Sequence, residues 1–345
     1  MPVGVMHCIY CGSEDLNEEH YLPACLGSFK NYIPLTDRVC LKCNAICGQL
    51  DEQLCRSGGE SFFRVFLGIT GRKSHTKVNP FYRGSSGAPA LEMVGVSSVT
   101  GESTPLELIS DTEVRELRCI RLFTDADVEH LIRITDGMTP DLFCEQFNAL
   151  GIKQFKKAII SASEEEREWV MKLIESFKFE PISSWASPPG GISYGPSTIK
   201  IQVTERYFRD IAKIGFHYFL TKMLQYRGDE SFFDEIREFI IKPARLENCR
   251  KFITQSNDPS VWGIGPGERL NVWGHILSAE IDYFNLIVRV NLFAGPTNRP
   301  LIYVVRLGNN PSRIHYTQKE ADFFVYFPRG EREPYDGEVV PMISG

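Results

Sequence analysis

The N-terminal region contains two pairs of cysteines, each with two residues between its members: Cys8 and Cys11, and Cys40 and Cys43. Four thiolates at this spacing can hold one zinc ion in a closed tetrahedral site. Ten cysteines in a short secreted chain would favour a disulfide framework, but this chain has 345 residues and four of its ten cysteines form the two pairs. The pattern therefore predicts a structural zinc site with reduced thiolates.

Residues suited to metal and proton chemistry lie beside these pairs. The segment Glu18-Glu19-His20-Tyr21-Leu22-Pro23 lies between them, and Asn44 follows the fourth cysteine directly. A neutral imidazole can take a proton from water, and carboxylate and amide oxygens can hold a hard divalent cation. Adjacent residues of a strand point to opposite faces, so Glu19 and His20 can share one target only where the strand is distorted or ends.

The order C-x-x-C, acid-His, apolar residue and Pro, then C-x-x-C-N resembles the HNH nuclease superfamily with its ββα-metal core. It is most similar to the zinc-stapled branch, which includes phage endonuclease VII and bacterial restriction-type HNH proteins. The resemblance covers residues 7–56. It implies that Glu19 binds a catalytic Mg²⁺ or Mn²⁺, that His20 is the general base and that Asn44 completes the metal shell. It further implies cleavage of DNA, in preference to RNA, in restriction or anti-phage defence.

One position of the HNH pattern departs from this resemblance. The middle Asn, which orders the loop that carries the histidine, has no counterpart in Pro34-Leu35-Thr36-Asp37-Arg38-Val39, just before the third cysteine. Asn31, Thr36 and Asp37 are the candidates for its role.

A helix is expected after the second cysteine pair. Ile46, Leu50 and Leu54 are four residues apart and predict one apolar stripe, with Asn44 and Asp51 on the opposite side. Asp51 is a further candidate for orienting the metal or its water, and the alternative is a solvated surface carboxylate. The remaining cysteines of this region are interpreted as buried small hydrophobic residues: Cys25, Cys47 and Cys55.

A basic and aromatic segment follows. The chain has no acidic residue between Glu60 and Glu92, although its formal net charge is −6. Such a segment can follow a phosphate backbone, and the alternative is a linker with a buried aromatic face. The candidate nucleic-acid-binding residues are Arg64, Arg72, Lys73, Lys77 and Arg83.

The fold class predicted is α+β, with a small N-terminal ββα-metal unit, a larger mixed region and an antiparallel meander at the C-terminal end. Hydrophobic content of 43% and charged content of 24% are those of a folded protein. We expect four segments: 1–60 as the nuclease domain, 61–84 as a connector, 85–187 as an accessory region and 192–345 as a C-terminal domain that could join 85–187 in one unit.

Periodicity and turn residues place the elements beyond the zinc region. The strands expected are a hairpin over Ala90–Asp111, its partner Leu117–Phe123, then 198–203, 276–281, 286–292 and 302–307. The helices expected are Asp125–Ile134, Pro140–Leu150 with Thr139 as N-cap, 163–177, Glu205–Gln225 with Thr204 as N-cap, and 232–241. His217 in the long helix is interpreted as a core histidine.

Two classes of function remain open at this point. The first is the metal-dependent endonuclease, with DNA as partner, a homodimer as a further candidate and a C-terminal region that binds a regulatory protein or small molecule. The second is a zinc-containing adaptor that binds nucleic acid or protein without catalysis. No apolar stretch predicts a membrane span or signal peptide, so we expect a cytoplasmic protein.

Overall fold

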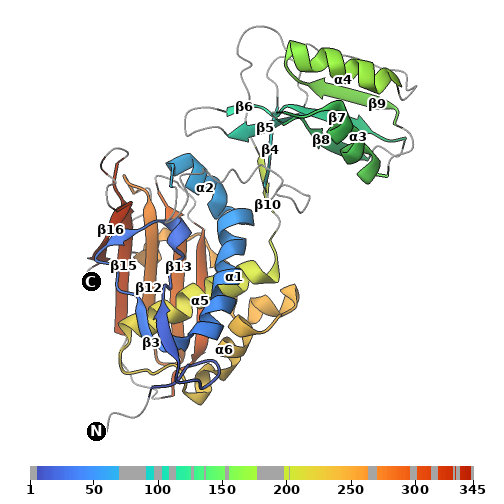
Figure 1. Cartoon of the computed structure of the whole chain (residues 1–345). Helices are drawn as coiled ribbons and strands as arrows, with labels where there is room; N and C mark the ends of the chain where they lie inside the picture. Colours follow the sequence, from blue (N-terminus) through green and yellow to red (C-terminus); the bar gives the residue numbers. More distant parts are fainter. Residues whose placement is uncertain are drawn as a thin grey trace. The chain divides into compact units, whose positions relative to one another are not determined.

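The computed structural model (Figure 1) describes residues 6–69, 91–96, 103–108, 114–125, 128–135, 137–151, 155–176, 198–201, 203–262, 270–295, 301–311, 318–328, 331 and 335–342. Helices and sheets both occur, which confirms the α+β class. The assignment of an HNH unit stays a prediction.

The chain forms two compact units, and the first is discontinuous in sequence. Unit 1 consists of Met1–Leu91 and Ile201–Gly345, and unit 2 is the insertion Glu92–Lys200. This division differs from the four predicted segments, because the N-terminal zinc region shares one hydrophobic core with the C-terminal part of the chain. A separate domain over 1–60 and a common unit of 85–187 with 192–345 are therefore both wrong.

Unit 1 is built on a seven-stranded sheet within the described residues. The strand order is β11-β14-β13-β12-β15-β16-β2, and all neighbours are antiparallel except β16 and β2. The predicted meander is confirmed as β12, β13 and β14, whereas the other strands were not foreseen. Their bounds are β2 (Phe29–Lys30), β11 (Ile253–Ser256), β12 (Gly274–Ile281), β13 (Asn285–Ala294), β14 (Ile302–Asn309), β15 (Gln318–Tyr326) and β16 (Gly337–Met342).

Helix α5 (Glu205–Lys222) lies between this sheet and the N-terminal elements (Figure 1). Every side chain from Arg209 to Leu220 is buried, so the helix has no solvent face in that stretch. A Cβ at Gly215 would lie 3.2 Å from Val305 of β14, which shows how closely α5 approaches the sheet. Thr204 is at the N-cap position, but its side chain makes no capping hydrogen bond, contrary to the prediction.

The N-terminal elements are a two-stranded antiparallel hairpin and a helix. Strand β1 (Leu16–Glu19) pairs with β3 (Leu35–Cys40), and α1 (Leu41–Ser57) begins directly after β3. Helix α2 (Glu60–Leu67) follows and occupies the start of the predicted connector. Another helix of unit 1, α6 (Asp234–Ile241), packs against α5 and follows the short 3-10 helix 231–233.

The buried stripe of α1 differs from the prediction. It consists of Cys43, Cys47, Leu50 and Leu54, whereas Ile46 is half-buried. Pairing with α5 shifts the buried face by part of a turn, because α5 covers the side that carries the cysteines. Cys47 is buried as expected.

A disulfide joins Cys25 and Cys55, with 6.2 Å between their Cα atoms. The interpretation of these two residues as separate small hydrophobic residues was therefore wrong, because the 3-10 helix Ala24–Leu26 brings Cys25 to Cys55 in the C-terminal part of α1.

The described residues of unit 2 form two further sheets. The first has the order β10-β4-β5-β6, and the second has the order β8-β7-β9. The predicted hairpin is present as β4 and β5, but its next partner is β6, and 119–123 belongs to the second sheet. The bounds are β4 (Leu91–Val96), β5 (Ser103–Leu108), β6 (Val114–Glu116), β7 (Cys119–Phe123), β8 (Glu129–Arg133), β9 (Lys157–Ser161) and β10 (Thr198–Ile201).

Two helices, α3 (Pro140–Ala149) and α4 (Glu164–Ser176), lie in the part of unit 2 that contains the β8-β7-β9 sheet. Both were predicted, and the Thr139 side chain accepts a hydrogen bond from the Leu142 amide as the expected N-cap. Within the segment predicted as a helix, Asp125–Ile134, residues Glu129–Arg133 instead form strand β8, which pairs antiparallel with β7.

Candidate metal centre

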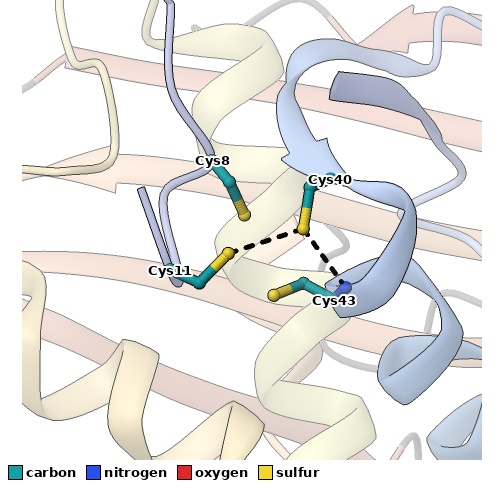
Figure 2. Close-up of side chains that lie close together, drawn as sticks. All are labelled: Cys8, Cys11, Cys40 and Cys43. Carbon is teal, nitrogen blue, oxygen red and sulfur yellow. Dashed lines mark hydrogen bonds between the residues drawn. The ribbon is translucent and has the colours of Figure 1, made fainter. Parts of the chain in front are cut away.

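The four predicted zinc ligands lie together at the junction of the hairpin and α1. The Sγ atoms of Cys8, Cys11, Cys40 and Cys43 are all within 4.8 Å of one another, and Figure 2 shows their side chains pointing toward a common centre. The Cys11 and Cys40 sulfurs are 3.5 Å apart. Sulfurs bound to one zinc ion at tetrahedral angles are about 3.8 Å apart, so this donor set fits zinc.

Local backbone structure positions each pair. The Cys8 amide donates to the Ser13 carbonyl, and the Gly12 amide donates to the Cys8 carbonyl, which closes a tight turn. Gly12 has a φ of 75°, in the left-handed region that glycine adopts without strain. The Ile9 amide donates to the Arg38 carbonyl of β3, so the first pair is held against the strand that ends at the second.

Cys40 is both a candidate ligand and the N-cap of α1. Its sulfur accepts a hydrogen bond from the Cys43 amide at 3.4 Å. Burial alone would raise the pKa of Cys40, but this hydrogen bond and those from the neighbouring thiols lower it to about 7. Thiolates are favoured at helix N-termini for the same electrostatic reason, which suits a metal ligand.

The predicted catalytic residues lie at the end of β1 and in the first turn of α1. The pairing of β1 with β3 is irregular between Asn17 and Glu19, and β1 ends at Glu19. The expected strand distortion is therefore present, but the Glu19 and His20 side chains still point in different directions. The Asn44 side chain donates from Nδ2 to the Glu18 carbonyl at 2.9 Å, which ties α1 to the strand.

His20 follows directly after the strand, and its side chain is 25% exposed. Its Nε2 lies 3.4 Å from the Glu18 carboxylate, and its ring stands against Tyr32 with centroids 5.4 Å apart. The imidazole is therefore positioned on both sides and still accessible to a small molecule.

Glu19 points the other way, into the protein, and is 3% exposed. Its Oε1 lies 3.8 Å from Lys213 Nζ and 3.6 Å from His217 Nδ1, both on α5. Burial raises the pKa of Glu19, but the nearby His217 imidazole and the charge of Lys213 outweigh it, and the pKa is lowered. Glu19 is therefore ionised in the folded protein.

Lys213 is the centre of a group of ionisable residues that we name the buried charge cluster. The ammonium also pairs with Asp51 of α1 and lies 3.4 Å from Asp210 Oδ1. The His217 Nε2 pairs with the Tyr10 hydroxyl at 2.7 Å, which connects the cluster to the first cysteine pair. The members are Glu19, Asp51, Asp210, Lys213 and His217.

Sequence reasoning missed most of this cluster. Asp51 was predicted either to orient the metal or to be a solvated surface carboxylate, and it pairs with Lys213 instead. His217 was correctly placed in the core, but its contact with Glu19 was not foreseen. Asp210, Lys213 and His217 are three and four residues apart within 210–220, a stretch whose other residues are apolar or aromatic, and this signal could have marked them.

The arrangement does not fit a divalent cation beside Glu19. In the described part of the chain, the four cysteines are the one set of three or more Cys, His, Asp or Glu ligands close enough to hold a metal ion. The Glu19 carboxylate faces an ammonium group, which repels a second cation.

Arg64 is buried, which contradicts its predicted role as a nucleic-acid contact. Arg64 lies in α2, is 6% exposed and donates from Nη1 to the Cys55 carbonyl at 2.8 Å. It therefore stabilises the junction of α1 and α2. The other predicted contacts, Arg72, Lys73, Lys77 and Arg83, lie outside the described residues.

Of the helices in the described ranges, none is long and apolar enough to cross a membrane. No protein-family model, no curated protein and no solved structure matches this chain.

Proposed function

We propose that the chain is a zinc-containing endonuclease that hydrolyses phosphodiester bonds in DNA, with His20 as general base, Glu19 and Asn44 beside it, and Mg²⁺ or Mn²⁺ as the required cation. The observation that carries this proposal is the hydrogen bond from Asn44 to the Glu18 carbonyl at 2.9 Å. It holds the residue after the fourth cysteine against the strand end that carries Glu19 and His20.

His20 has the access and the partners that a general base needs. Its ring is a quarter exposed, whereas the other histidine near this site, His217, is fully buried. The imidazole nitrogen takes a proton from water while the water oxygen forms a bond to phosphorus. The bond from phosphorus to the leaving sugar oxygen then breaks. Glu18, 3.4 Å away, stabilises the resulting imidazolium.

The larger C-terminal part of unit 1 serves, in this proposal, to regulate the site or to bind a partner. Support comes from α5, which places Lys213 and His217 against Glu19. Because a single site cuts one strand, cleavage of a duplex requires two subunits or two binding events. A cytoplasmic role in restriction or anti-phage defence would suit such a nuclease.

The test is incubation of the zinc-loaded full chain with supercoiled plasmid, single-stranded DNA and RNA, in Mg²⁺, Mn²⁺ or chelator. The proposal expects nicking of plasmid that depends on the divalent cation, with RNA cut less. Asn44→Ala should lower the rate by about tenfold to a hundredfold, the range typical of outer partners of a metal site. Binding without cleavage in every metal would contradict the proposal.

A second candidate is a zinc-containing adaptor that binds nucleic acid or protein without catalysis. The observation that favours it is the burial of Glu19, which is 3% exposed and paired with Lys213. An adaptor requires zinc alone. Its binding would therefore persist unchanged when Mg²⁺ and Mn²⁺ are withheld, and Glu19→Gln would affect stability only.

A further inference from the structure

The buried charge cluster holds three carboxylates around a single ammonium group. Lys213 pairs with Asp51, and its Nζ lies 3.4 Å from Asp210 and 3.8 Å from Glu19. Lys213 and Asp210 have no solvent exposure. A buried lysine is retained only where opposite charges compensate its lost hydration, and here the carboxylates raise its pKa although burial lowers it.

Polar atoms of the cluster remain without hydrogen bonds. Both carboxylate oxygens of Asp210 and the Nδ1 atom of His217 are fully buried and lack a hydrogen-bond partner. Burial raises the pKa of Asp210 well above its ordinary value. Even without a charge on Asp210, the carboxylates of Glu19 and Asp51 outnumber the single ammonium group, and clustered carboxylate oxygens are the ligands that hard divalent cations prefer.

We propose that the Lys213 side chain is a tethered cation that occupies the place of a divalent cation beside Glu19, so that α5 controls the metal affinity of this site. The consequence for cleavage rests on the proposed nuclease function. A divalent cation binds Glu19 only when the Lys213 ammonium moves away from it. The backbone of Lys213 belongs to a buried helix, so the side chain alone has to move before a divalent cation can replace the ammonium group beside Glu19.

The contacts of Lys213 explain why its ammonium group is favoured over a divalent cation from solution. Asp51 belongs to α1 and Asp210 to α5, so the ammonium joins the N-terminal helix to the C-terminal core. A cation arriving from solution loses hydration and translational freedom, whereas Lys213 is already in place. Any partner that shifts α1 relative to α5 would weaken this hold and raise the metal affinity.

The test is Mn²⁺ binding to the zinc-loaded full chain, measured by electron paramagnetic resonance and calorimetry. Lys213→Met keeps the length of the side chain and removes its charge, and it should bind Mn²⁺ at least about tenfold more tightly than wild type, a difference of about 1.4 kcal/mol. Glu19→Gln in the same chain should abolish the gain. The matched control is Lys222→Met, on the same helix, which should bind Mn²⁺ as wild type does.

Two results would overturn the inference: a folded, zinc-loaded Lys213→Met that binds Mn²⁺ no more tightly than wild type, or a gain that persists in the double variant. Should Lys213→Met fail to fold, Lys213→Gln is measured in its place. A gain in Mn²⁺ affinity over wild type that Glu19→Gln abolishes supports the inference, and no gain in a folded, zinc-loaded Lys213→Gln contradicts it.

The same samples separate this inference from the proposed function. Tight Mn²⁺ binding by Lys213→Met without nicking of plasmid would support the tethered cation and count against the nuclease. Nicking by wild type together with unchanged Mn²⁺ binding in Lys213→Met would support the nuclease and reject the tethered cation.

Discussion

Glu60 is a buried carboxyl group whose ionisation should make stability depend on pH. It accepts a hydrogen bond from the Tyr207 hydroxyl at 2.5 Å, and its second oxygen has no partner. Burial raises the pKa of Glu60 to about 7, although the Tyr207 hydrogen bond opposes the shift. The unfolded chain releases this proton near pH 4.5, so the contribution of Glu60 to stability is fully present below that pH and is lost as the pH rises through 7.

Glu60→Gln should remove that part of the pH dependence. Between pH 4.5 and pH 8, wild type should lose about 3 kcal/mol in the free energy of unfolding that Glu60→Gln does not lose, since each unit of pKa shift corresponds to about 1.4 kcal/mol. Urea unfolding at the two pH values measures this difference from wild type. The exposed Glu247→Gln is the control and should show none. An identical change with pH in wild type and Glu60→Gln would contradict this expectation.

Candidate site residues that lie at short, fixed spacings could be recognised from the sequence alone. The four cysteines, the Glu19-His20 pair and Asn44 were found because fixed short spacings carry them. Lys213 could not be found in that way, because its partner Glu19 is almost two hundred residues away in the chain and the fold alone brings them together. The burial of Arg64 was missed for a different reason: its partner, the Cys55 carbonyl, is close in the sequence, but a basic side chain gives no sign that it will bind a carbonyl group.

The two cysteine pairs hold the β1–β3 hairpin to α1, so metal removal should destabilise unit 1. Cys43→Ser, or removal of zinc by a chelator, should lower the stability by about 5 kcal/mol or more, because structural zinc contributes directly to folding. In a unit of this size the melting temperature should fall by about 10–20 °C. Calorimetry together with zinc analysis measures this.

The control for that experiment is Cys144→Ser, a half-buried thiol of α3 in unit 2. It should retain both zinc and melting temperature. A Cys43→Ser protein that loses zinc yet melts as wild type would show that the cysteine group does not stabilise the fold.

Elements with one solvent face were predicted better than elements buried all round. Helix α3 and its Thr139 cap follow from amphipathic spacing and a capping residue, and both are present. Helix α5 was expected to have one buried face, but the sheet covers one side and α1 the other. Strand β8 was mistaken for a helix because a five-residue strand offers too few positions to distinguish the two periods.

At the scale of the whole molecule, the N-terminal region should not fold independently. Val39, Leu50 and Leu54 belong to the same core as α5 and the seven-stranded sheet. A fragment of residues 6–69 should bind zinc through its four cysteines but show poor chemical-shift dispersion and no cooperative thermal transition. The full chain should show both. A well-dispersed, cooperatively unfolding fragment would contradict the shared core.

Domain boundaries were the least predictable feature, because unit 1 is interrupted by unit 2. A break rich in proline and glycine at 187–191 indicated one boundary close to the end of the insertion at Lys200. The parallel pairing of β2 with β16 joins residues about three hundred positions apart. No local sequence pattern predicts such a contact, since the two strands become neighbours only when the whole sheet has formed.

The nuclease proposal is tested most directly by plasmid nicking with His20→Ala, measured beside wild type at saturating Mn²⁺. His130→Ala, a half-buried histidine of β8 in unit 2, is the matched control. We expect His20→Ala to keep its zinc and its melting temperature but to lose at least about a hundredfold in nicking rate, as a general base would, while His130→Ala cuts as wild type does. Equal nicking by His20→Ala and wild type would contradict the role of His20 and, with it, the proposed site.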